Sequence, residues 1–313
     1  MNCSTPSLSL SGIFPPLVTP LKAESDSLEI DVDGLHRLLE HVLAGSVTGV
    51  FALGTTGETA SLTPRLRREM VEATCQIVAG QAPVLVGITD TCLEQSLELA
   101  DVAHQAGAAC LVAAPPYYYP SSQDELLGYY QRLLQDLPLP LLLYNIPSCT
   151  KTSLEVETVC HLADHPQVVG MKDSSRDWDF FRQLLDSLGG RDDFSLLVGP
   201  EVLLSRAVQA GATGGICGGA NMHPSLYVQL YEAAVAKDPQ HVAESHSVVE
   251  RIGETIYSVS DSPARLIQTI KAALRCLNIC NDTMAAPLVS LDEEHREQVR
   301  QHLEALGITS APA

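Results

Sequence analysis

Short apolar runs recur along the chain, each bounded by glycine, proline or polar turn residues. Between consecutive runs, apolar residues return every three or four positions, which is the spacing of an amphipathic helix. Runs that are apolar on both faces and alternate with helices are typical of parallel strands in βαβ units. The predicted strands are residues 12–20, 48–54, 83–89, 109–116, 140–147, 168–175, 194–200 and 213–221.

This alternation predicts the fold class. Eight such strands, spread over roughly 235 residues, indicate an α/β protein with a closed (β/α)8 TIM barrel. An open doubly wound sheet is the alternative, but it usually has fewer strands and a GxGxxG fingerprint, which this chain lacks. Beyond residue 223 the spacing is helical throughout. We expect a barrel domain over residues 1–236 and a C-terminal helical segment over residues 237–313, packed on the barrel.

Composition narrows the possible partners. The chain has 313 residues, 45% of them hydrophobic, and a formal net charge of -19. Such acidity argues against nucleic acid and anionic membranes, which are bound by basic patches. The chain has no apolar run of about 18 residues and no basic N-terminal region, so we expect neither a membrane span nor a signal peptide. The nine cysteines form no CxxC pair and are expected to be reduced, as in a cytoplasmic protein.

Lys172 is the lysine that the pattern places inside an apolar strand, in "VVGMKDSS". An ammonium among apolar groups is costly unless it is paired or neutralised, and its pKa falls. A neutral amine can attack a ketone and form a Schiff base, whose protonated imine accepts electrons from a neighbouring bond. A lysine that snorkels from the strand end is the alternative.

Other strand ends supply groups that suit this chemistry, because strand ends form the active site of such a barrel. Tyr144 ends the preceding strand, and its phenol can carry protons. The motif "GTTGE" offers the hydroxyls of Thr55 and Thr56 and backbone N–H groups for a carboxylate, although a phosphate would also fit. Glu58, which ends this motif, is expected at a helix start.

Two further sites are expected to be structural. His161 and His165 lie four residues apart but lack an HExxH pattern, so we expect an exposed helix end rather than a metal site. This argues against a metal-dependent class II aldolase. Asp173 should point away from Lys172, because neighbouring side chains alternate along a strand, and is expected to accept structural hydrogen bonds.

The motifs "GTTGE", "PPYYYPSS", "YNIP", "GMKDSS" and "GGICGGAN" occur in an order and spacing that resemble the dihydrodipicolinate synthase/N-acetylneuraminate lyase family of class I aldolases. The resemblance covers nearly the whole chain. It implies a Schiff base between Lys172 and pyruvate, no cofactor, no metal and a homotetramer.

The same resemblance implies roles for individual residues. Tyr144 would shuttle protons, and Thr55 would link it to Tyr118 of a neighbouring subunit. The carboxylate of the 2-oxo acid would be held by Thr55 and Thr56 in the loop that begins at Gly54. The backbone carbonyl of Ile216 would lie near the lysine, while Gly199 and Glu201 would contact the rest of the substrate.

One position departs from the family pattern. Dihydrodipicolinate synthases resemble "YNVPSRTG", in which the arginine grips the carboxylate of aspartate semialdehyde, whereas this chain has Cys149 in "YNIPSCTK". A cysteine cannot form that bidentate contact. We therefore expect a lyase that joins or splits pyruvate and an aldehyde, with a 2-keto-3-deoxy sugar acid or an N-acetylneuraminate-like substrate. The alternatives are dihydrodipicolinate synthase, a sugar acid dehydratase, and, least favoured, a non-catalytic sensor or scaffold.

Overall fold

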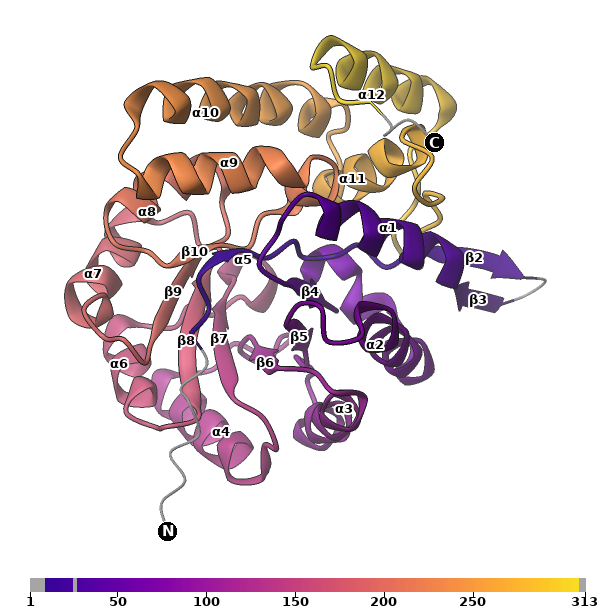
Figure 1. Ribbon diagram of the computed structural model, residues 1–313. Coiled ribbons are helices and arrows are strands. Elements are labelled where there is room, and N and C mark those ends of the chain that lie inside the picture. Colours follow the sequence, from indigo (N-terminus) through magenta and orange to yellow (C-terminus); the bar gives the residue numbers. More distant parts are fainter. Residues whose placement is uncertain (1–8, 25–26, 310–313) are drawn as a thin grey trace.

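The computed structural model describes residues 9–24 and 27–309. Its centre is a parallel sheet of eight strands that curls into a barrel, with helices on the outside (Figure 1). Each strand lies within one of the eight predicted runs, so the TIM-barrel prediction is confirmed. The strands are β1 (Gly12–Ile13), β4 (Val50–Ala52), β5 (Val84–Gly87), β6 (Cys110–Ala113), β7 (Leu141–Asn145), β8 (Val168–Asp173), β9 (Ser195–Val198) and β10 (Gly214–Gly215).

The barrel is closed by the residues that follow β1. The N–H of Leu17 donates to the carbonyl of Phe51 at 2.8 Å, and the N–H of Phe51 donates to Pro15 at 2.9 Å, which joins the two edges of the sheet. On its other side, β1 pairs with β10 through Gly12 and Gly214. A Cβ atom on Gly214 would lie 2.0 Å from the carbonyl oxygen of Gly12, so only glycine permits this approach.

The helices follow the predicted alternation. Thr63 caps α2 by accepting a hydrogen bond from the N–H of Leu66, and Gly107 ends α3 in the left-handed conformation. The barrel helices are α1 (Val32–Ala44), α2 (Pro64–Val78), α3 (Leu93–Ala106), α4 (Gln123–Asp136), α5 (Pro147–Thr150), α6 (Val156–Ala163), α7 (Trp178–Leu188), α8 (Leu204–Gln209) and α9 (Pro224–Val235). The 3-10 turns η1 (Thr55–Gly57), η2 (Thr59–Ser61), η3 (Glu201–Leu203) and η4 (Gly218–Asn221) follow strand ends.

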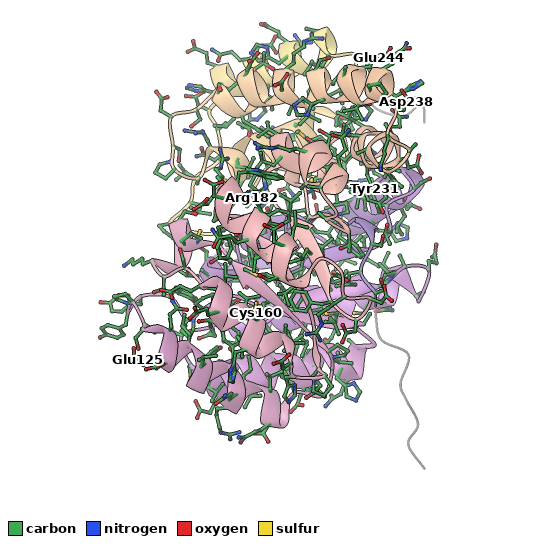
Figure 2. All side chains as sticks on the ribbon, turned by 90° about the vertical axis from the view of Figure 1, so that its left-hand side faces the viewer. Glu125, Cys160, Arg182, Tyr231, Asp238 and Glu244 are labelled. Carbon is green, nitrogen blue, oxygen red and sulfur yellow. The ribbon has the colours of Figure 1, made fainter. Side chains whose placement is uncertain are left out.

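Three helices follow the barrel and gather on one side of it: α10 (Pro239–Glu254), α11 (Arg265–Cys276) and α12 (Glu293–Ala305), with η5 (Ile256–Ser258) between the first two (Figure 1). Helix α10 packs on α9, and α11 packs on both α12 and η1. In the side view, Cys160 of α6 and Arg182 of α7 lie on the barrel helices, and Asp238, directly before α10, lies above them in the C-terminal helices (Figure 2). Within the described residues, no helix is both long and apolar enough to cross a membrane.

An antiparallel hairpin of β2 (Leu21–Glu24) and β3 (Ser27–Ile30) projects from the barrel and was not predicted. Its strands are partly exposed and rich in polar residues, so they leave no apolar run. Lys22 lies in β2, where it pairs with Glu24 at 2.7 Å. The expectation that Lys172 is the one strand lysine is therefore wrong, although Lys22 is solvent-exposed.

Apolar side chains fill the barrel interior. Leu10 enters from the N-terminal segment, and its N–H donates to Ser195 Oγ at the start of β9 at 2.9 Å. It thus lies at the end of the barrel opposite to the strand C-termini. The inner cluster comprises Leu10, Phe14, Phe51, Leu85, Cys110, Val112, Ala114, Leu142, Tyr144, Val169, Leu197 and Ile216.

Candidate active site

Lys172 and Tyr144 lie side by side near the C-terminal ends of β8 and β7, where they are register partners. Both are buried, with 4% and 5% of their surfaces exposed. The Lys172 Nζ atom lies 4.0 Å from the centre of the Tyr144 ring and 5.2 Å from that of Phe51. Among the residues that the structure describes, no carboxylate forms an ion pair with this amine. Strand β8 thus holds the Lys172 amine against two aromatic rings inside the barrel, not on its surface.

The loop after β4 approaches this pair. Thr55 Oγ1 lies 3.4 Å from the hydroxyl of Tyr144, so the two groups can share a proton. Thr56 is buried beside it. A Cβ atom on Gly54 would lie 2.7 Å from the Phe51 ring, which explains why glycine stands where the loop crosses the barrel. The structure therefore brings together Lys172, Tyr144 and the predicted carboxylate-binding loop.

The loop after β8 is fixed by hydrogen bonds. Asp173 accepts from Asn145 Nδ2 at 2.8 Å and from the hydroxyl of Ser175 at 2.9 Å, in the structural role expected for it. Burial raises the pKa of the Asp173 carboxyl, and these hydrogen bonds oppose the increase. The N–H of Gly199 donates to the carbonyl of Asp173 at 2.7 Å, so the loop after β9 lies against this one.

Glu201 is bound by protein groups. Its carboxylate accepts hydrogen bonds from the N–H of Gly219 at 2.7 Å and from the hydroxyls of Tyr227 and Tyr257. Burial raises the pKa of this carboxyl, and the three donors lower it. These contacts tie η3 to η4, α9 and η5. A substrate would have to compete with these hydrogen bonds, so the contact between Glu201 and substrate stays a prediction. Ile216 is buried at the end of β10, and the role of its backbone carbonyl also stays a prediction.

Tyr118 and Cys149 lie at the exposed rim. Tyr118 has a positive φ of 91°, is 68% exposed and packs edge-to-face on Tyr119. It makes no hydrogen bond to Thr55 of its own chain in the described structure, so its predicted link would require a second subunit. Cys149 is exposed on α5. His161 and His165 are exposed at the end of α6, as expected.

A second lysine is buried, at a position that the sequence pattern does not predict. Lys271 of α11 is fully buried and forms an ion pair with Glu58, whose side chain is also fully buried. Glu58 stands at the start of the 3-10 turn η2 rather than of an α-helix: it also ends η1, has a left-handed φ of 59°, and its side chain does not cap the turn. A helical lysine in "QTIKAALR" gives no sign of burial in the sequence, because only the tertiary contact with Glu58 shows it.

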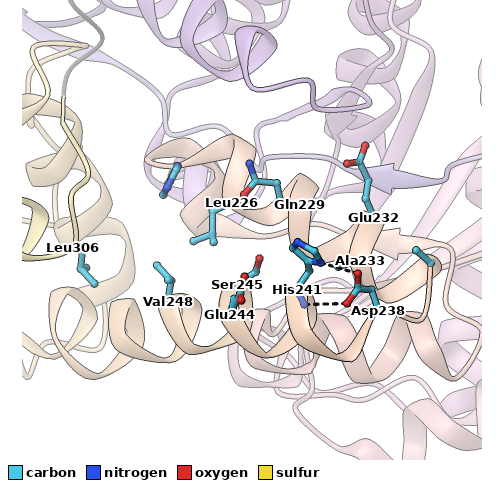
Figure 3. Close-up of a pocket in the computed structure, with 12 residues that line it drawn as sticks. Leu226, Gln229, Glu232, Ala233, Asp238, His241, Glu244, Ser245, Val248 and Leu306 are labelled. Atoms are coloured by element: carbon cyan, nitrogen blue, oxygen red, sulfur yellow. Dashed lines mark hydrogen bonds and ion pairs between the residues drawn. The ribbon is translucent and has the colours of Figure 1, made fainter.

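A separate cavity of about 570 Å³ lies between α9 and α10, outside the barrel (Figure 3). Leu226 and Gln229 line it from α9, and His241 and Val248 line it from α10. His241 is held by Asp238 at 2.7 Å. None of the strand-end residues described above borders this cavity, so it is not the candidate active site.

Comparisons with known proteins agree with this fold. The model of the dihydrodipicolinate synthetase family matches residues 9–306. A 4-hydroxy-tetrahydrodipicolinate synthase of Methanopyrus kandleri is 30% identical over 96% of this chain and 97% of its own. A solved dihydrodipicolinate synthase of Bacteroides thetaiotaomicron superposes with a TM-score of 0.91 and is 44% identical, over 95% of this chain and 98% of that one. YagE of E. coli K12, solved with pyruvate, has a TM-score of 0.89 and 27% identity over 95% and 99%.

Proposed function

The chain belongs to the dihydrodipicolinate synthetase family of lyases, and we propose that it acts through a Schiff base between Lys172 and pyruvate. The observation that carries this proposal is the buried Lys172 amine, which has no acidic partner among the described residues and lies 4.0 Å from the ring centre of Tyr144. A structural lysine would be paired or would reach solvent. The family likeness to YagE, whose structure holds pyruvate, supports this substrate.

The residues suit each step of such a reaction. In its deprotonated form the amine attacks the ketone carbon of pyruvate, and the carbinolamine takes up a proton and loses water to leave a protonated imine. Tyr144 lies close enough to carry the protons that this step moves, with Thr55 at 3.4 Å as its relay. Loss of a proton from the methyl carbon then gives an enamine, which attacks the aldehyde carbon and forms the new C–C bond. Water finally hydrolyses the imine and restores the amine, and cleavage follows the same steps in reverse.

The names of the relatives support aspartate semialdehyde as the aldehyde, ahead of the sugar acids that the sequence favoured. The product would then be that of a 4-hydroxy-tetrahydrodipicolinate synthase. A second candidate is an aldolase or dehydratase for 2-keto-3-deoxy sugar acids. It is favoured by Cys149, because an exposed thiol at that position cannot form a bidentate contact with the carboxylate of aspartate semialdehyde.

Borohydride reduction in the presence of pyruvate tests the common step. We expect a stable adduct that maps to Lys172, no adduct in Lys172→Ala, and an unchanged adduct in Lys237→Ala, which removes an exposed lysine. Absence of an adduct, or an adduct elsewhere, would overturn the proposal. Activity that is lost on chelation without any adduct would instead support a metal-dependent lyase.

A substrate panel then separates the two candidates. Aspartate semialdehyde, 2-keto-3-deoxy sugar acids and N-acetylneuraminate are assayed for consumption or release of pyruvate. Turnover of aspartate semialdehyde alone supports the synthase, and turnover of sugar acids alone supports the second candidate. We further propose that the enzyme is a cytoplasmic homotetramer, as the family resemblance implies.

A further inference from the structure

The Glu58–Lys271 ion pair joins the candidate active site to the C-terminal helices. Glu58 is the last residue of "GTTGE", directly after Thr55–Gly57 of η1, and Lys271 lies on α11. Both side chains are completely shielded from solvent. Neither group contacts Lys172 or Tyr144 in the described structure, so the proposed reaction does not use them directly.

The pair is completed by backbone groups of the segment after α11. Lys271 Nζ donates to the carbonyl of Thr283 at 2.6 Å, and the N–H of Ala285 donates to Glu58 Oε2 at 2.8 Å. Burial lowers the pKa of the Lys271 ammonium, while the Glu58 carboxylate raises it again. Each charge is therefore compensated only while both partners are in place.

Hydrogen bonds of Glu58 and of the adjacent Gly57 hold the backbone that carries Thr55 and Thr56. The N–H of Glu58 donates to the carbonyl of Thr55 at 3.1 Å, and the carbonyl of Gly57 accepts from Thr19 Oγ1 at 2.7 Å. A left-handed φ at Glu58 is unfavourable for a residue with a long side chain. The buried side-chain contacts offset this cost and hold the turn in one conformation.

We propose that Glu58 and Lys271 are positioning residues: through them, the C-terminal helices hold the Thr55–Thr56 loop in the geometry that binds the carboxylate of the 2-oxo acid. This inference rests on the proposed function, because it assigns the loop to the carboxylate of the Schiff-base substrate. It predicts that pyruvate affinity depends on a contact that lies outside the barrel strands.

The test uses a double variant, Glu58→Gln with Lys271→Met, which removes both charges and leaves no unpaired ion. The pyruvate concentration that gives half-maximal borohydride trapping should rise about tenfold, which is the effect of losing one hydrogen bond to a charged group. The control Arg300→Met removes exposed ion pairs to Glu297 and Glu304 on α12, away from the Glu58–Lys271 pair. It should change half-saturation less than about twofold, as is usual for a site that shares no partners with the loop.

A double-mutant cycle separates positioning from general stability. Thr56→Val should raise half-saturation strongly in the parent and only weakly in the double variant, because the loop is already displaced there. Half-saturation within twofold of the parent, or effects that add fully with Thr56→Val, would overturn the inference. Should the double variant not fold, Glu58→Asp is used instead, because it retains both charges but shortens the acidic side chain. Half-saturation within twofold of the parent, or full additivity with Thr56→Val, would again overturn the inference. A parent that gives no adduct at all would instead refute the proposed function.

Discussion

The amine of Lys172 lies over the ring of Tyr144, 4.0 Å from its centre, and the two residues are register partners on neighbouring parallel strands. The ring face supports the amine, and the hydroxyl at the ring edge points to Thr55. One side chain can thus both shield the nucleophile and supply its proton carrier. The strand register and the contact with the Phe51 ring set this arrangement, since no ion pair among the described residues holds Lys172 in place.

Tyr144→Phe separates these two roles. The ring remains, so we expect the fold and pyruvate binding to be retained, whereas the rate should fall by about 10² to 10⁴, as is typical when a proton carrier is lost. Single-turnover trapping of the imine measures the rate and pyruvate binding. Circular dichroism and thermal unfolding measure whether the fold is retained. Thr55→Val should lower the rate less. A Phe variant with parental activity would show that another group carries the proton.

Cys149→Arg tests the physical basis of aldehyde selection. A guanidinium at this exposed position of α5 can bind a carboxylate through two hydrogen bonds. We expect kcat/KM for aspartate semialdehyde to rise at least about tenfold, while Cys149→Gln, which adds length without charge, should have little effect. If the parent already uses this aldehyde efficiently and the arginine adds nothing, then another group binds the carboxylate.

Tyr118→Ala tests the contribution of a second subunit. The side chain is 68% exposed in one chain, so its removal should leave the stability of the isolated subunit unchanged. If Tyr118 completes the proton relay across an interface, the rate should fall by about ten- to a hundredfold. Tyr119→Ala, which removes the equally exposed neighbour, is the matched control. Light scattering at the assay concentration should report a tetramer, and a fully active monomer would contradict the relay.

Glu201 should make stability depend on pH. Burial raises its pKa above the ordinary value of 4.5, so the folded state favours the protonated carboxyl. The resulting stabilisation is complete below the pKa of the unfolded chain and is lost as pH rises through the folded value. Glu201→Gln stays neutral, so the stability of the parent relative to this variant should decrease between pH 4.5 and 7.5.

Urea unfolding of both proteins across this range measures the difference. Glu232→Gln, which removes an exposed carboxylate from α9, provides the matched control. If the difference in the free energy of unfolding between the parent and Glu201→Gln stays constant with pH, then folding does not raise the pKa of the Glu201 carboxyl.

The barrel strands could be predicted because burial on both faces leaves an uninterrupted apolar run. The β2–β3 hairpin could not, since its partly exposed strands carry Lys22, Glu24 and Glu29. Lys172 was identified for the same reason as the strands: a charge inside an apolar run is visible in the sequence. Lys271 could not be identified in this way, because helical spacing does not show which residue packs over a polar side chain. Its partner Glu58 is distant in sequence. The hydrogen bonds from Tyr227 and Tyr257 to Glu201 were hidden in the same way.

Leu10 is buried in the barrel interior, at the end opposite to the strand C-termini that carry Lys172. The proposed substrates would then reach the amine from the end of the strand C-termini, whose rim carries the exposed Tyr118 and Cys149. In the proposed reaction the enamine forms from the keto acid, so the keto acid would bind before the aldehyde, through the same opening. An excess of aldehyde should therefore inhibit, because it would occupy this opening before the keto acid binds.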